Sequence, residues 1–261
     1  MSRLFCDGIT KSLEIPKGGV LLISSDIVNL AFQASLSGET FSCDALIESF
    51  KAALGPEGTL LFPTFNYDFC EGKTFDIRKT PSRTGALSKA ALLRPDFQRT
   101  RHPIYSFAVW GKHQKYLCGL NNQSSFGEDS PFAFLYHENA LMLLIGLSYQ
   151  GAFTFVHYAE ETERVSYRYF KEFRAPYIDE EGHSEIRGYT MFVRDLEKGV
   201  VSSVDPIGET LETKKIAVLK KIHGVDFRMI RLKNAYEEIV GDIRQNSGRK
   251  LYTTESTLPK A

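Results

Sequence analysis

The stretch of residues 151–161 combines one imidazole with two carboxylates at helical spacing. His157 lies in a hydrophobic run, and Glu160 and Glu161 follow it at positions i+3 and i+4. If residues 153–163 form a helix, these offsets place a carboxylate on the same face as His157. A carboxylate beside an imidazole fixes its tautomer, raises its basicity and stabilises the imidazolium, so the pair predicts a general base for pH 7. Spacing alone also fits a helix with a partly buried histidine and a solvated acidic end, which is the more common arrangement.

The elements that precede this segment alternate between strand and helix patterns. The predicted strands are residues 20–24, 59–62, 104–111 and 141–145, and the predicted helices are residues 43–54 and 84–93. This alternation predicts an α/β fold with a mostly parallel central sheet flanked by helices. His157 would then lie on a helix just after the C-terminal end of a central strand, where α/β enzymes place catalytic groups.

The last third of the chain begins with a hairpin pattern. Residues 167–174 and 186–194 alternate apolar or aromatic with polar side chains, and a turn sequence at residues 179–182 lies between them. This pattern predicts an antiparallel extension within residues 164–205.

Two amphipathic helices and a polar tail are predicted after the hairpin. The helices cover residues 209–221 and 234–245, with a strand at residues 227–232 between them. No linker or repeat interrupts the chain, so we expect one domain over residues 1–261, with a polar tail at residues 249–261.

Two polar stretches could bind an anion. Thr84 and Gly85 open a predicted helix, where amide N–H groups and a hydroxyl favour a phosphate, although ordinary helix capping explains them as well. Arg94, Arg99 and Arg101 follow that helix and could hold a phosphate or pyrophosphate, or form a solvated basic loop.

Composition argues against several classes of protein. Lysine plus arginine and aspartate plus glutamate both number 32, so the net charge of zero gives no basic field for nucleic acid. No segment approaches the roughly 20 apolar residues of a membrane span, and the N-terminus lacks the apolar core of a signal peptide. The scattered cysteines suggest neither a zinc site nor a disulfide framework, so we expect no metal and a cytoplasmic protein. They are Cys6, Cys43, Cys70 and Cys118.

Several short motifs occur in order between residues 58 and 160. They are Gly-Thr-Leu-Leu-Phe-Pro-Thr-Phe at residues 58–65, Thr-Pro-Ser-Arg-Thr-Gly-Ala-Leu at 80–87, Arg-His-Pro at 101–103 with Ser-Phe-Ala at 106–108, Phe-Gly-x-x-Ser-Pro at 126–131, Leu-Leu-Ile-Gly at 143–146 and Thr-x-x-His-x-Ala-Glu at 154–160. Taken together, they make the chain resemble the aminoglycoside N3-acetyltransferase family of coenzyme A-dependent N-acyltransferases over about residues 15–165.

The resemblance implies a role for each matching residue. His157 corresponds to the family's general base and Glu160 to the carboxylate that supports it. The residues that correspond to coenzyme A contacts are Ser24, Ser25, Asp26, Thr84, Gly85, Ala86, Leu87, Arg101, Ser106 and Phe107. Ser24 stands where the family usually has a histidine, so any role of that imidazole is absent here.

The expected acceptor is the amino group of a nucleotide-linked (dTDP or GDP) dideoxy amino sugar used for surface polysaccharides such as O-antigen or capsule. Some relatives in the resembling family act on such substrates, and balanced charge suits an anionic acceptor better than a polycationic antibiotic. The expected acceptor-binding residues are Tyr67, Asp68, Arg83 and Ser130, in a cleft walled by residues 66–83 and 167–173. The expected counter-ions of the diphosphate are Arg78, Lys79, Arg83 and Arg168. Transfer would be direct, from acyl-CoA to the amine in a ternary complex.

Other readings remain open at this point. The first alternative is an aminoglycoside 3-N-acetyltransferase that confers antibiotic resistance. A binding protein that has lost its chemistry is a second alternative, and a hydrolase using Ser130 or Ser106 with His157 is a third, although no GxSxG motif supports it. The sequence also leaves open the acyl chain and the oligomeric state, with a homodimer as one option.

Overall fold

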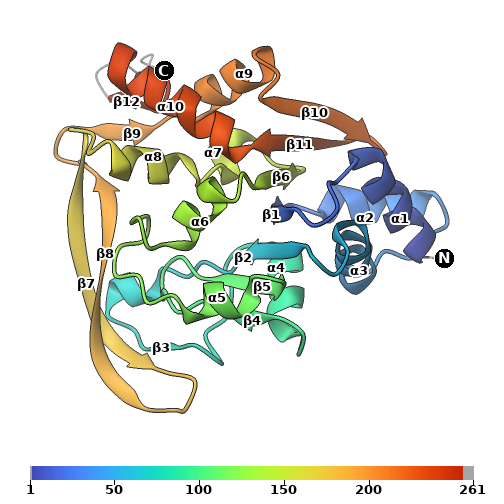
Figure 1. The fold of residues 1–261 in the computed structure, drawn as a ribbon, viewed down its shortest axis with the longest axis horizontal. Helices are drawn as coiled ribbons and strands as arrows, with labels where there is room; N and C mark the ends of the chain where they lie inside the picture. Colours follow the sequence, from blue (N-terminus) through green and yellow to red (C-terminus); the bar gives the residue numbers. More distant parts are fainter. Residues whose placement is uncertain (1, 255–261) are drawn as a thin grey trace.

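The computed structural model describes residues 2–254, and its centre is a mixed sheet (Figure 1). The strand order is β10-β11-β6-β1-β2-β5-β4. The bounds are β1 Val20–Ser25, β2 Thr59–Pro63, β4 Gln98–Arg99, β5 Phe107–Gly111, β6 Leu141–Ile145, β10 Ala217–Ile222 and β11 Val225–Arg231.

The direction of the strands confirms the predicted α/β class. β6, β1 and β2 are adjacent and parallel, and they form the centre of the sheet. β5 and β11 run antiparallel to their neighbours on both sides, so the outer strands β4 and β10 run in the same direction as the centre. Because both faces of the central strands are covered, their sequences are continuous apolar runs rather than alternating ones.

The two faces of the sheet pack into two separate cores. In β1, Leu21 and Ile23 belong to one core, whereas Val20 and Leu22 belong to the other. The first core is covered by α1 Ser2–Leu13, α2 Val28–Leu36, α3 Cys43–Leu54 and α4 Gly85–Leu93. The second is covered by α5 Gln114–Gly119, α6 Pro131–His137, α7 Tyr149–Ala152, α8 Val156–Thr162, α9 Asp205–Thr213 and α10 Leu232–Asn246. This alternation follows from the two-residue repeat of a strand.

A long hairpin forms the predicted antiparallel extension and curves along one side of the molecule (Figure 1). β7 (Arg168–Ile178) pairs with β8 (Ser184–Arg194) along their whole lengths, and β3 (Phe75–Asp76) adds to β7 in parallel. β9 (Val200–Ser202) pairs with β12 (Tyr252–Thr254), so the predicted tail begins with a short strand. The rest of that predicted tail, residues 255–261, lies outside the described residues.

Two predicted helices differ from the structure. The helix expected over residues 153–163 is shorter in the structure, where only α8 lies in that range, and Phe153, with ψ at 58°, ends the preceding short helix α7. The prediction of a helix over residues 209–221 is wrong for the residues that follow α9. Lys215 turns the chain with φ at 57°, and residues 217–222 form a strand that pairs with β11. Pairing with a neighbouring strand here overrides a local helical pattern.

Several further elements were not predicted, among them three helices in the first third of the chain. These are α1, α2 and the 3-10 helix η1 (Asp68–Glu71), which lies inside the expected loop of residues 66–83. None of the described helices has the length and apolar content that crossing a membrane requires.

Candidate active site

His157 and Glu160 lie on α8, and their side chains meet as the i, i+3 spacing predicts. His157 Nδ1 lies 2.6 Å from Glu160 Oε2. The Glu160 side chain is 1% exposed, whereas that of His157 keeps 20% of its surface accessible. When the carboxylate is ionised, Nδ1 carries the shared proton and Nε2 keeps a free lone pair. The pair can therefore accept one proton from a group bound beside Nε2.

A third group, Arg168 at the start of β7, binds the same carboxylate. Its Nε lies 2.8 Å from Glu160 Oε2, and its other nitrogens donate to Phe192 O at 3.1 Å and Ser202 Oγ at 3.3 Å. Burial by itself would raise the pKa of Glu160, but the charge of Arg168 and the interaction with His157 outweigh it and keep that pKa below its usual value. The hairpin thus holds Glu160 in its ionised form.

The pKa of His157 is lowered, contrary to the expectation that the carboxylate would raise its basicity. Burial lowers the pKa of His157 most, Arg168 lowers it further, and Glu160 only partly opposes them. The sequence could not show this because the arginine comes from a different element. The imidazole is therefore neutral at pH 7, which is the form that a general base needs.

A cavity of about 470 Å³ opens beside His157. Tyr67, from the segment after β2, lines it together with Tyr105, and their hydroxyl oxygens lie 3.4 Å apart. The lining also includes Phe126, Arg168, Tyr169, Lys171, Phe173, Met191, Phe192, Val193, Arg194, Leu196 and Ser202. The structure therefore brings together at His157 the two segments that were expected to wall the acceptor cleft.

The four cations expected to hold a diphosphate all lie near carboxylates of the protein. Arg78 Nε lies 3.4 Å and Lys79 Nζ 3.9 Å from the carboxylate of Asp76. Arg83 pairs with Asp68 at 3.1 Å, so these two predicted acceptor-binding residues bind each other. Arg168, the fourth expected cation, forms an ion pair with the buried carboxylate of Glu160. Of the four, only Arg168 lines the cavity beside His157, so the expectation for this set stays a prediction.

Two other cations line the cavity, and sequence reasoning missed both. Lys171 Nζ lies 5.4 Å from the ring centroid of Phe173, and Arg194 lies directly opposite Arg168 in the register of the hairpin. Neither Lys171 nor Arg194 forms an ion pair with any residue that the structure describes, and no carboxylate is among the lining residues. The wall of the cavity formed by the hairpin is therefore positively charged.

The end of β1 and the beginning of α4 come together, as the predicted coenzyme A contacts require. Gly85 has φ at 69°, and a Cβ there would lie 2.7 Å from the carbonyl oxygen of Ser25. The Thr84 hydroxyl donates to the carbonyl of Pro63 at the end of β2. Gly85 and Ala86 are exposed, so the first turn of this helix reaches the surface, and the Thr84 amide before it donates to Ser82 Oγ at 3.1 Å.

The remaining predicted residues of these two stretches differ in how accessible they are. Asp26 is exposed, and its carboxylate accepts from the Val28 amide at 3.0 Å. Ser24 and Leu87 are buried, so neither side chain lies on an open surface, and Leu87 belongs to the first core.

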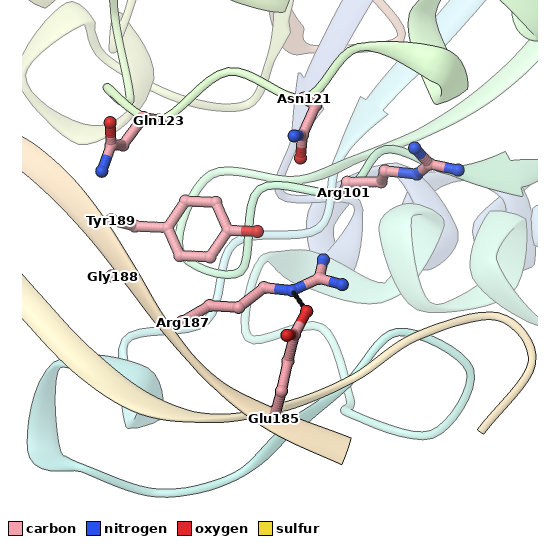
Figure 2. A pocket seen from close by; sticks show the side chains of 7 residues that line it. All are labelled: Arg101, Asn121, Gln123, Glu185, Arg187, Gly188 and Tyr189. Atoms are coloured by element: carbon pink, nitrogen blue, oxygen red, sulfur yellow. Dashed lines mark hydrogen bonds and ion pairs between the residues drawn. The ribbon is translucent and has the colours of Figure 1, made fainter. Parts of the chain in front are cut away.

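Arg101 is not brought to that surface. Its Nε donates to Glu180 Oε1 at 2.9 Å, and it shares a groove with Leu92 near the C-terminal end of α4, away from Thr84. It also lines a separate pocket of about 430 Å³, where Figure 2 shows Arg187 paired with Glu185. The expectation that Arg101 and Thr84 bind one anion together has no geometric support.

Ser106, Phe107 and Ser130 are also placed in the interior. Ser106 Oγ accepts from Arg99 Nε at 2.9 Å and donates to Thr64 O at 3.1 Å, and Phe107 is fully buried. Ser130 is 1% exposed and caps α6 by accepting from an amide N–H. These hydroxyls are used by the fold, so none of the three residues lies on an open binding surface.

His102, in the Arg-His-Pro motif, has a structural role. Its Nδ1 accepts from the backbone amides of Ile104 at 3.3 Å and Tyr105 at 3.1 Å. Burial lowers the pKa of His102 to about 3, so the ring is neutral and holds the turn before β5. Among the described residues, a His–carboxylate cluster occurs at the hairpin turn, formed by Asp179, Glu181 and His183, but exposed acidic groups of this kind are common without a metal.

Comparison with known proteins identifies the relatives of this chain. A family model described as aminoglycoside 3-N-acetyltransferase matches residues 32–241. The chain is 25% identical over 193 residues to the SPbeta prophage-derived aminoglycoside N(3')-acetyltransferase-like protein YokD of Bacillus subtilis (strain 168), covering 65% of this chain and 68% of that protein. It is 28% identical over 158 residues to aminoglycoside N(3)-acetyltransferase IV of Salmonella sp, covering 60% of this chain and 57% of the relative.

Solved structures show the same fold. The aminoglycoside acetyltransferase AAC(3)-Xa has a TM-score of 0.78 at 20% identity, covering 94% of this chain and 93% of its own. AAC-IIIb, solved as a binary complex with CoASH, has a TM-score of 0.79 at 17% identity, and the match covers 94% of this chain and 97% of AAC-IIIb.

Proposed function

Because the chain belongs to the aminoglycoside 3-N-acetyltransferase family, we propose that it acetylates an amino group of an aminoglycoside. Membership makes the chain an acyl-CoA-dependent N-acyltransferase with coenzyme A as its co-substrate. The relatives described above carry aminoglycoside names, so they support the alternative of the sequence analysis better than its first choice. The nucleotide-linked sugar and the surface-polysaccharide role have no support from these relatives.

The observation that carries the proposal is the 2.6 Å contact between His157 Nδ1 and Glu160 Oε2 beside an open cavity. An amine must be neutral to attack a thioester, and it loses a proton as its nitrogen bonds to the acyl carbon. His157 Nε2 accepts that proton, and Glu160 stabilises the imidazolium. The carbon–sulfur bond then breaks, the amide is released, and the proton passes from His157 to the departing thiolate, so the base is regenerated.

Ser25, Thr84, Gly85 and Ala86 are the residues that we propose to hold phosphate groups of coenzyme A. The support is the open N-terminus of α4, a nine-residue helix, against the end of β1. Amide N–H groups at a helix N-terminus favour an anion without any basic side chain. This assignment leaves the cavity at His157 for the thioester and the amine.

A second acceptor class is favoured by one observation. Lys171 and Arg194 line the cavity without ion-pair partners among the described residues, and no carboxylate lines it. Such a wall attracts an acceptor that carries a phosphate, such as a nucleotide-linked amino sugar, and repels a polycation. The charge of the cavity and the names of the relatives therefore favour different acceptors.

Thiol release from acetyl-CoA tests the proposal and separates the two acceptor classes. We expect turnover with an aminoglycoside such as sisomicin or gentamicin, and a loss of about 10²- to 10⁴-fold in kcat for His157→Asn. Turnover only with a dTDP- or GDP-linked amino sugar would replace the aminoglycoside by the second class. Full activity of His157→Asn would refute the assignment of the base.

A further inference from the structure

The second carboxylate of α8, Glu161, binds a loop that forms part of the cavity. Its Oε1 accepts from Ser124 Oγ at 2.5 Å, and the residue is only 4% exposed. Burial raises the pKa of Glu161, although the bond from Ser124 opposes this. A carboxylate buried on the same helix as the base, with no role in proton transfer, needs a physical reason.

The loop that Glu161 binds is also bound to the hairpin. Thr190 on β8 donates its amide to Gln123 O at 2.9 Å, and its carbonyl accepts from the Ser125 amide at 2.9 Å and from Ser125 Oγ at 3.0 Å. The loop then turns closely at Gly127, beside the carboxylate. A Cβ on Gly127 would lie 3.0 Å from Asp129 Oδ1, 3.3 Å from the Cβ of Ser124 and 3.8 Å from Glu161 Oε1.

The next residue of this loop, Phe126, packs against the base. Its ring centroid lies 5.4 Å from that of His157, with an interplanar angle of 66°. On its other sides it meets Tyr105 at 4.8 Å and Phe132 at 4.9 Å. The imidazole is therefore held at Nδ1 by Glu160 and at its ring by Phe126.

We propose that Glu161 is a positioning residue, which ties the loop of residues 123–126 to α8 and so holds Phe126 against the imidazole of His157. The inference rests on the proposed role of His157 as the base. Glu161 does not touch the reacting atoms; it acts through Ser124 and Phe126. Because a misplacement of about 1 Å can cost about 100-fold in rate, partial loosening of this ring should lower kcat about tenfold.

The kinetic test compares Glu161→Ala, Ser124→Ala and the double variant. Each single change should lower kcat about tenfold while the KM for acetyl-CoA stays within about twofold, because the phosphate site proposed at the N-terminus of α4 is untouched. The double variant should be no worse than Glu161→Ala alone, because that change already removes the acceptor of the Ser124 bond. Glu161→Gln keeps an acceptor oxygen for Ser124 and should recover most of the activity. Unchanged kcat in both single variants, or losses that multiply in the double variant, would overturn the proposal.

The matched control is Glu163→Ala. Glu163 follows α8, and its carboxylate pairs with Arg244 at 2.7 Å, away from the loop. We expect its kcat to equal that of the wild type. A tenfold loss in this control would show that any lost carboxylate near α8 lowers activity, and the proposal would fail.

A spectroscopic measurement tests the contact without relying on activity. The ring current of Phe126 shifts the Cε1 proton of His157, whose signal is identified among the six histidines by its absence in His157→Asn. Glu161→Ala and Ser124→Ala should move this signal towards its value in Phe126→Leu. An unmoved signal would refute the coupling. Full activity of His157→Asn would instead refute the base assignment, so the two failures are distinguishable.

Discussion

The balance of charge at Glu160 can be tested by Glu160→Gln, which keeps the shape of the side chain and removes its charge. Glu160 is 1% exposed and binds both His157 and Arg168, whose own side chain is only 7% exposed. In the variant, the guanidinium stays buried without a counter-charge. Removing one partner of a buried ion pair costs about 3–5 kcal/mol. We expect a loss near the lower limit, about 3 kcal/mol, because Arg168 keeps its bonds to Phe192 and Ser202.

The same change should slow the reaction. The imidazolium that forms on His157 loses its carboxylate and still faces Arg168. A hydrogen bond to a charged group contributes about 1.5–3 kcal/mol, so kcat should fall about 10- to 150-fold, less than for His157→Asn. If the unpaired cation causes the instability, Glu160→Gln combined with Arg168→Met should regain at least half of the lost stability.

Urea unfolding followed by circular dichroism, together with thiol release from acetyl-CoA, measures both effects. Glu163→Gln is the matched control, because its partner Arg244 is 68% exposed, so the cation left unpaired is hydrated instead of buried. The reasoning is refuted if Glu160→Gln unfolds within about 1 kcal/mol of the wild type, or if the double variant is no more stable than Glu160→Gln alone.

Gly85→Ala should be less stable than Gly38→Ala by about 1 kcal/mol or more in urea unfolding. The two glycines have nearly the same φ, 69° and 70°, but only at Gly85 would an added Cβ meet backbone atoms of β1. Equal stabilities of the two variants would contradict this close approach of β1. Lys171→Glu and Arg194→Glu should lower the KM for a cationic acceptor and raise it for an anionic one, and equal effects on both acceptors would show that these charges do not act on the acceptor. Burial lowers the pKa of His102 to about 3, below an unfolded value of about 6.5, so the folded state binds fewer protons in acid. The contribution of the neutral His102 ring to the stability of the fold is complete above pH 6.5 and is lost as the pH falls from there towards 3. An NMR titration of His102 in the folded protein with a midpoint above pH 5 would contradict this.

Several features could be predicted because they depend on residues close together in the chain. The apolar runs of β1, β2 and β6 are buried on both faces, and their composition shows this without any knowledge of their partners. The contact between His157 and Glu160 follows from three residues of helical rise, so it was visible in the spacing. The hairpin was also predictable, since alternation on both sides of a turn is local.

Other features depend on which distant segments pack together. The residues after α9 have a helical pattern, yet pairing with β11 makes them a strand. Ser106 and Ser130 have the right chemistry for a site, but burial by the surrounding core uses their hydroxyls inside the fold. No local pattern gives the neighbours of a side chain across the fold, so these residues could be judged only in three dimensions.

The sequence by itself determined the central strands and the contact between His157 and Glu160, because each depends on the fixed geometry of a short stretch of chain. Only the tertiary structure decided the electrostatics of the site. The fold places Arg168 on the carboxylate of Glu160, and Lys171 and Arg194 along the cavity. The pKa of His157 falls because of burial and of Arg168, and both arise only when the hairpin packs beside α8. Charge interactions depend on distance through space and on exclusion of water, neither of which is set by distance along the chain.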